Sequence, residues 1–287
     1  MELGIGLALV CAAVTQLGFL CKHRGAAGAP QVRLREPLRS ARELFASRWF
    51  ALGMAVAAAA WLLHVAALAL VPLSTVQAVL STGVVMLAVL GARLFGHDVS
   101  ARQWAGVAMT ATGLALLVLT LPSPDGSGSA FAAPGLLAFE AATLVLGSLL
   151  IAAPRMGAPA QHHGVLLGAA AGVLFGVSDV ALKALTGMAG DGPIGLIGSP
   201  WLPIAALASV LAFLASARGF QEGDAVPVIA STSTAANLTC IVGGIVVFGD
   251  ALAAGILLGV QLAAFALVAA AALLTPSGHG RPLAQPA

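Results

Sequence analysis

Residues 164–186 read GVLLGAAAGVLFGVSDVALKALT, an apolar run that is long enough to span a bilayer as one helix. Asp179 and Lys183 lie four residues apart in this run, so an α-helix places them on one face. Because a charge within a bilayer is costly, ionisable residues there are paired or functional. The spacing therefore leaves two interpretations open: mutual neutralisation, or a functional site.

Glycines recur in the same run at a spacing of four residues. Gly168, Gly172 and Gly176 form a smooth stripe along one helical face. Small residues in such a stripe let a second helix approach closely. We therefore expect this helix to lie in the interior of a helical bundle.

The composition of the whole chain indicates a membrane protein. Hydrophobic residues make up 60% of the 287 residues, charged residues make up 8%, and the mean hydropathy is +1.01. This charge is too sparse to cover a soluble domain of that length. Cys11, Cys21 and Cys240 fall within or at the end of apolar runs, which predicts neither a disulfide framework nor a zinc site. We expect no cofactor and no nucleic-acid partner.

The predicted fold class is all-α, a polytopic membrane protein with about nine transmembrane helices. The expected helices are residues 2–21, 49–70, 72–95, 103–121, 134–152, 164–186, 201–217, 225–248 and 253–275.

Basic residues predict the orientation in the cell membrane. Seven Lys or Arg lie in residues 22–48, which we expect to be a cytoplasmic loop. Alternation along the chain then places the N-terminus outside and the C-terminus in the cytoplasm. Every Lys and Arg falls on the cytoplasmic side except Lys183, which suggests that this lysine has a specific task.

A faint internal repeat relates the two halves of the chain. Displacing residues 89–121 by 153 positions pairs Phe95 and Gly96 with Phe248 and Gly249. Helices one to four then correspond to helices six to nine, with helix five as a connector. An offset of five helices reverses direction in the membrane, so the halves form an inverted repeat, as in many secondary transporters.

The repeat divides the chain into four parts. They are a first repeat over residues 1–121 with the basic loop 22–48, a linker and connecting helix over 122–157, a second repeat over 158–275, and a disordered cytoplasmic tail over 276–287.

Two stretches resemble the drug/metabolite transporter superfamily. They are residues 67–117, which contain LSTVQAVLSTGVVMLAVLGARLFGHDVSARQWAGVAM, and residues 218–252, RGFQEGDAVPVIASTSTAANLTCIVGGIVVFGDAL. Within that superfamily the nine-helix layout is most similar to the NIPA-type magnesium transporters. That similarity rests on FLCKHRGA (19–26), PGLLAFEAATLVLGSLLIAAPRMG (134–157) and FGVSDVALKALTG (175–187). The resemblance implies an integral membrane carrier of divalent cations.

The sequence also departs from the NIPA pattern. Trp61 and His64 stand where that pattern places an acidic residue and an amide. Mg²⁺ prefers oxygen ligands, usually including one or two carboxylates. The departure therefore weakens magnesium as the substrate more than it weakens transport as the function.

Polar residues within the expected helices are the candidate substrate-binding residues. They are Asp179, Glu140, His64, Lys183, Gln77 and Asn237. By helical rise, His64, Glu140 and Asp179 all lie about 9–10 Å from the outer ends of their helices. We expect them to line one polar cavity, with Gln77 near its mouth and Asn237 nearer the midplane. Asp179 and Glu140 are the candidate metal ligands, and helix packing is the alternative role for the histidine and the amides.

Three functions follow from these residues. The leading hypothesis is transport of a small solute, with a divalent cation such as magnesium as the first candidate. The alternative is proton-linked export of a small metabolite, amino acid or drug, because an ammonium group near Asp179 would repel a cation. A non-transporting structural membrane protein is a third hypothesis. No catalytic constellation points to an enzyme. The expected partners are the bilayer and a small-molecule or ion substrate, with a homodimer left open.

Overall fold

The chain is a polytopic helical membrane protein. The computed structural model describes residues 2–33, 36–71, 73–80, 83, 86–87, 90, 100–120, 130–188, 190, 192–250 and 255–273. Six helices in this part are long and apolar enough to cross a membrane. They are α1 (Glu2–Ala27), α3 (Arg48–Leu70), α7 (Ala133–Ala152), α8 (His163–Gly187), α10 (Trp201–Glu222) and α11 (Ala225–Phe248).

Shorter elements complete the described part of the chain. Helices α4 (Leu73–Leu80), α6 (Ala101–Thr120) and α12 (Ile256–Leu273) occupy the other three segments for which spans are predicted. Helices α2 (Pro37–Phe45) and α9 (Gly192–Gly198), with the 3₁₀ turns η1 (Ala153–Met156) and η2 (Ala160–His162), lie in connections. The number of spans, the inverted repeat and the four-part division stay predictions. Residues 91–99, 121–129 and 276–287 of those predicted parts lie outside the described residues.

Helix α1 is longer than the predicted span at residues 2–21. It continues to Ala27, so Lys22, His23 and Arg24 belong to the helix and not to the loop that follows. Lysine and arginine are good helix formers, and the chain leaves the helix only at Gly28-Ala29-Pro30. Because of this extension, Lys22 lies on a helix within the bundle and can contact neighbouring helices.

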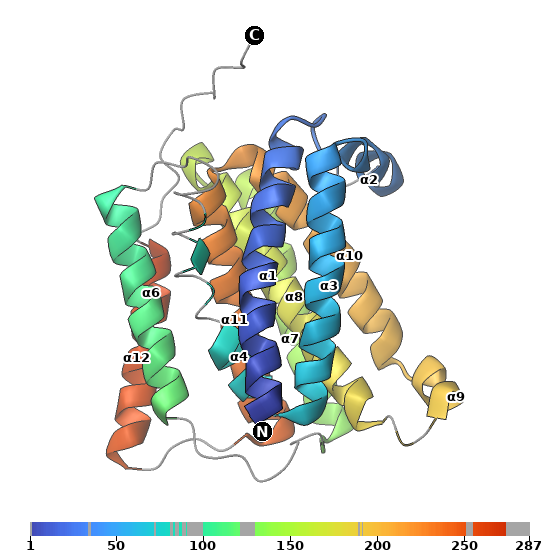
Figure 1. Cartoon of the computed structure of the whole chain (residues 1–287), viewed down its shortest axis with the longest axis vertical. Coiled ribbons are helices and arrows are strands. Elements are labelled where there is room, and N and C mark those ends of the chain that lie inside the picture. Colours follow the sequence, from blue (N-terminus) through green and yellow to red (C-terminus); the bar gives the residue numbers. More distant parts are fainter. Residues whose placement is uncertain are drawn as a thin grey trace.

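Helix α8 is an interior helix, as its glycine stripe predicts (Figure 1). Helix α11 lies directly on that stripe. A Cβ atom at Gly168 would lie 2.5 Å from Oγ of Ser231, and one at Gly172 would overlap the carbonyl oxygen of Thr232. The prediction of close helix packing is therefore confirmed.

Helices α1 and α3 form a second close pair, side by side in Figure 1. A Cβ atom at Gly18 would lie 3.3 Å from the carbonyl oxygen of Gly53, so both glycines lie where the helices approach. At one edge of the bundle α6 packs against α12, and Nε2 of Gln261 donates a hydrogen bond to the carbonyl oxygen of Thr120 at 3.0 Å. Small residues thus allow close packing of α1 on α3, and a buried amide links α6 to α12.

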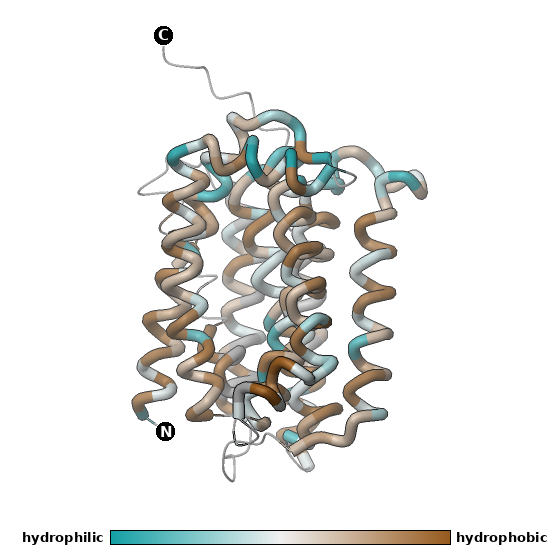
Figure 2. Tube along the Cα trace, turned by 90° about the vertical axis from the view of Figure 1, so that its right-hand side faces the viewer, coloured by the Kyte–Doolittle hydropathy of each residue, from teal (hydrophilic) through white to brown (hydrophobic). Residues whose placement is uncertain are grey.

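Hydrophilic residues gather at one end of the bundle, opposite the N-terminus (Figure 2). Of the described Lys and Arg residues, all except Lys183 belong to this end. Here the chain after α1 is held by α10: the amide group of Val32 donates to Oε1 of Gln221 at 2.8 Å, and Nη1 of Arg218 donates to the carbonyl oxygen of Val32 at 2.7 Å. The orientation of this charged end in the membrane stays a prediction from the basic residues.

The two larger apolar clusters of the described residues lie at different depths in the bundle. One includes Leu68, Val180 and Phe248, toward the end that holds the N-terminus. The other includes Phe50, Phe220 and Ile229, toward the charged end. The middle of the bundle between them contains polar side chains, and this is where the candidate site lies.

Candidate functional site

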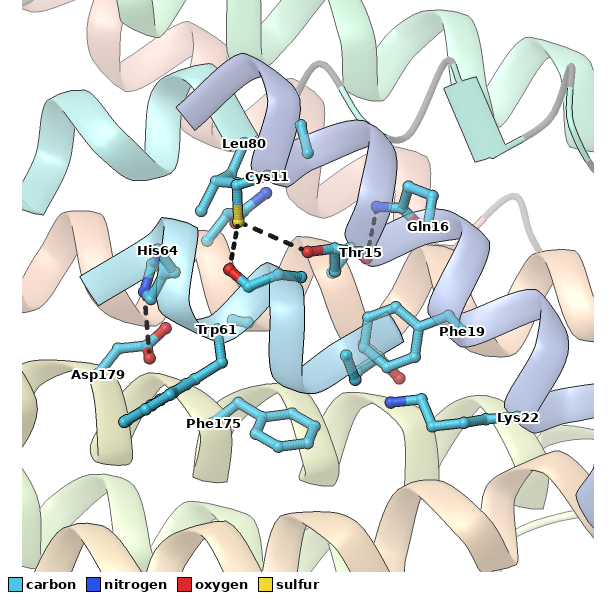
Figure 3. A pocket seen from close by; sticks show the side chains of 17 residues that line it. Cys11, Thr15, Gln16, Phe19, Lys22, Trp61, His64, Leu80, Phe175 and Asp179 are labelled. Atoms are coloured by element: carbon cyan, nitrogen blue, oxygen red, sulfur yellow. Dashed lines mark hydrogen bonds and ion pairs between the residues drawn. The ribbon is translucent and has the colours of Figure 1, made fainter. Parts of the chain in front are cut away.

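A cavity of about 190 Å³ lies among the middle parts of α1, α3, α8 and α11 (Figure 3). Polar groups line it from all four helices: Cys11, Thr15, Gln16, Lys22, His64, Asp179, Thr232, Ser233 and Asn237. Three aromatic rings, of Phe19, Trp61 and Phe175, also line it. The cavity therefore offers both hydrogen-bonding groups and apolar surface to a small occupant.

An acid and a base from different helices meet in the cavity wall. Nε2 of His64 on α3 lies 3.3 Å from Oδ1 of Asp179 on α8. The His64 side chain is 9% exposed and the Asp179 side chain is 21% exposed, so the carboxylate is the more accessible of the two. A histidine beside a carboxylate in a low-dielectric site can take up and release a proton. The pair is therefore the candidate reactive group of the described cavity.

Helix α11 adds a third group to this pair. The thiol of Cys240 donates to Oδ2 of Asp179 at 3.7 Å and approaches the carbonyl oxygen of Gly176 at 3.8 Å. Asp179 is thus contacted from α3 on one carboxylate oxygen and from α11 on the other. These contacts hold the carboxylate at the junction of three helices.

Two amide side chains leave hydrogen-bonding atoms unused in the cavity. Nε2 of Gln16 donates to Oγ of Ser233 at 3.3 Å, but its Oε1 has no partner in the described part of the structure. Nδ2 of Asn237 is likewise buried without a partner among the described residues. Buried polar atoms are nearly always satisfied, so these atoms are available to a bound molecule.

The structure brings three of the predicted site residues together and separates two. His64, Asp179 and Asn237 line the cavity, whereas Glu140 and Lys183 are not among its lining residues. The side chain of Gln77 lies outside what the structure describes.

Glu140 on α7 is buried, with 2% of its surface exposed. Neither of its carboxylate oxygens has a hydrogen-bond partner in the described part of the chain. Glu140 and His64 share the predicted depth, but depth does not fix the direction in which a side chain points. Helix α7 packs on α8 and α11, and Glu140 is not among the cavity-lining residues, whereas His64 is.

Lys183 also differs from its prediction as a partner of Asp179. Its Nζ donates to the carbonyl oxygen of Leu68 at 2.9 Å and to that of Val71 at 3.4 Å. These are carbonyl groups at the C-terminal end of α3, where a helix has unsatisfied acceptors and a partial negative charge. Asp179 and Lys183 therefore have different partners among the described residues.

Several lining residues on α1 are not among the residues predicted from the sequence. Cys11, Thr15, Phe19 and Lys22 lie at spacings of four, four and three residues, which places them on one face of α1. Lys22 was assigned to the cytoplasmic loop because the first helix was expected to end at residue 21. The helical spacing of these polar and aromatic residues was the available signal.

Ser231 and Thr232 on α11 have the structural role expected of small hydroxyls in a membrane helix. Both donate to the carbonyl oxygen of Val228 at 2.9 Å. Ser233, in the same run, accepts a hydrogen bond from Gln16, and both Thr232 and Ser233 line the cavity. One short polar run thus serves both packing and the cavity.

No arrangement of three His, Cys, Asp or Glu side chains in the described part of the structure could hold a metal ion. Comparison of the chain with protein-family models, with curated proteins and with solved structures found no match. The cavity itself is therefore the basis for assigning a function.

Proposed function

We propose that this protein transports a small organic solute across the membrane, with proton exchange at His64 and Asp179. The observation on which this proposal rests is the acid–base contact of 3.3 Å in the wall of a cavity midway along the bundle. Ionisable groups at that depth are costly unless they serve a pathway or pair with one another. A protonatable pair in the wall of a cavity offers a way to link proton and solute movement.

The apolar clusters on either side of the cavity support this proposal. One cluster packs around Leu68 and Phe248, and the other around Phe50 and Phe220. A carrier must close its site from one side while it opens to the other. The two apolar clusters lie on either side of the cavity. Each could open in turn while the other keeps the cavity closed.

Helix pairing supports an inverted-repeat carrier. Helix α1 packs on α3, and α8 packs on α10, so the first two helices of each predicted half are close neighbours. The corresponding pairs favour the resemblance to the drug/metabolite transporter superfamily, which stays a proposal.

The composition of the cavity favours an organic solute over magnesium. Mg²⁺ is bound by oxygen ligands that include carboxylates. Asp179 is already in contact with His64, Glu140 lies outside the cavity lining, and the ammonium group of Lys22 lines the same space. A volume of about 190 Å³ is also smaller than the roughly 300–1,000 Å³ of sites for drug-sized ligands. The expected solute is therefore a small metabolite.

Proteoliposomes that contain the purified full-length protein test this proposal. A pH-sensitive dye inside the vesicles reports proton movement when amino acids, monocarboxylates, amines or MgCl₂ are added, and a magnesium indicator reports Mg²⁺ uptake separately. We expect at least one organic solute to change the internal pH in wild-type vesicles and not in Asp179→Asn vesicles. Mg²⁺ uptake with no response to any organic solute would replace the proposal with cation transport.

A further inference from the structure

Lys22 is a buried cation in the lining of the cavity. It is 9% exposed, and its Nζ lies 4.1 Å from the centroid of the Phe19 ring. Figure 3 shows the side chain extended along the cavity, with its nitrogen beside the rings of Phe19 and Phe175. A lysine near a helix end ordinarily extends its ammonium group toward the headgroups. This one points into the bundle.

The stem of Lys22 is held in this direction by a glycine on the neighbouring helix. A Cβ atom at Gly53 of α3 would lie 2.7 Å from Cγ of Lys22 and 2.7 Å from its backbone nitrogen. Only a residue without a side chain leaves room for the lysine there. Gly53 is therefore a positioning residue for the ammonium group.

No carboxylate in the described part of the chain pairs with Lys22. Among the described lining residues Asp179 is the only acid, and it is in contact with His64. The thiol of Cys11 donates to the carbonyl oxygen of Ala60, one turn before His64, so Cys11 marks the His64 end of the cavity. Lys22 lies eleven residues farther along α1, or about 16 Å by helical rise. The two charged groups therefore lie at opposite ends of the cavity.

A buried ammonium group without a counter-ion is unfavourable until an anion reaches it. We propose that Lys22 binds the anionic group of the transported solute, which makes the substrate a small organic anion with a carboxylate or phosphate group and an apolar body. This inference rests on the proposed function. The rings of Phe19 and Phe175 contact the apolar body, and the unused Oε1 of Gln16 accepts a hydrogen bond from any donor that it bears.

Binding to the purified full-length protein in detergent tests the anion site without requiring transport. The probes are benzoate, phenyl phosphate and the neutral benzamide, and calorimetry gives their dissociation constants. We expect an anion to bind the wild type at least tenfold more tightly than benzamide does. Lys22→Gln should lower that affinity at least tenfold, while Lys22→Arg should preserve most of it, because a cation remains.

Two further variants separate a direct role from a general disturbance. Arg24→Gln removes a positive charge from the same helix end, but Arg24 stacks on Trp49 outside the cavity, so anion affinity should stay unchanged. Gly53→Ala displaces the Lys22 stem without changing any charge and should weaken anion binding; because its Cβ also crowds the backbone of α1, its melting temperature is measured beside its affinity. If Lys22→Gln fails to fold, the anion affinities of Gly53→Ala and Lys22→Arg decide whether Lys22 binds the anion.

The inference is overturned if neither anion binds the wild type, or if benzoate binds Lys22→Gln as tightly as the wild type. It is also overturned if phosphatidylglycerol in the micelles competes with benzoate in the wild type and binds less tightly to Lys22→Gln. The anion bound at Lys22 is then a lipid headgroup and not a solute. Anion binding without flux in the vesicles would contradict the proposed function and keep the anion site. Flux of an amine without anion binding would support the proposed function and contradict the anion site.

Discussion

Nζ of Lys183 on α8 donates a 2.9 Å hydrogen bond to the carbonyl oxygen of Leu68 on α3. The lysine is fully buried, and its second described acceptor is the carbonyl oxygen of Val71. A residue predicted to serve the substrate thus binds the end of a neighbouring helix. Its charge stabilises the carbonyl groups that the helix leaves without amide partners.

We predict that Lys183→Met lowers stability and leaves transport per folded molecule unchanged. Losing hydrogen bonds from a charged donor should cost about 1.5–3 kcal/mol of unfolding free energy. Thermal unfolding of the purified protein in detergent measures the loss. Leu182→Met, a similar change at the adjacent position without a polar loss, is the control. Normal stability with altered transport would instead place Lys183 in the substrate pathway.

A double-mutant cycle should detect coupling between His64 and Asp179. The variants are His64→Gln, Asp179→Asn and the double variant, and their unfolding free energies give the interaction term. Contacting groups in one network typically couple by about 0.5–3 kcal/mol, so the single changes should not add. Additive effects would mean that the 3.3 Å contact does not contribute to stability.

The same pair should be required for function. Asp179→Asn removes the acid but keeps its shape, so it should abolish solute-dependent proton flux while the protein remains in the membrane at normal abundance. The vesicle assay and membrane immunoblots measure the two outcomes. Normal flux in this variant would exclude Asp179 as the proton-binding group.

Gly172→Ala should destabilise the bundle. The added Cβ would overlap the carbonyl oxygen of Thr232, and helix backbones cannot yield without moving α11 away from α8. Overpacking of this kind costs about 1–3 kcal/mol. Gly6→Ala on α1, where no atom lies within 4 Å of the added Cβ, is the control and should be neutral or stabilising. Equal melting temperatures for both variants would contradict the tight α8–α11 contact.

Glu140→Gln should not reduce stability. The carboxylate of Glu140 is buried and has no hydrogen-bond partner among the described residues, so a neutral side chain of the same shape removes an unfavourable charge. We expect an unchanged or higher melting temperature in detergent. A clear decrease would reveal an interaction that the carboxylate makes and the amide cannot.

The orientation can be tested with single cysteines in a variant that lacks Cys11, Cys21 and Cys240. Gly28 follows α1 at the charged end, and Gly190 follows α8 at the opposite end; both are exposed. An impermeant thiol reagent applied to intact cells should label Gly190→Cys and should label Gly28→Cys only after permeabilisation. The opposite pattern would reverse the predicted orientation.

The sequence alone determined the class of protein and most helices. Apolar runs of about 20 residues can satisfy their backbone groups in a bilayer only as helices, so their positions follow from composition. The glycine stripe on α8 likewise predicted a close helix neighbour, because small residues at a spacing of four make one smooth face. The end of α1 was misplaced, because the first basic residue does not end a helix.

Which polar residues share a space was decided only by the tertiary structure. The depth of a residue follows from its count along a helix, and that count placed His64 and Asp179 correctly at one level. The direction in which it points depends on how each helix is rotated against its neighbours. Packing turned Lys22 into the cavity, left Glu140 out of the cavity lining and directed Lys183 to the end of α3. Helix rotation is set by contacts between residues far apart in the chain, and the spacing of residues along a single helix does not contain that information.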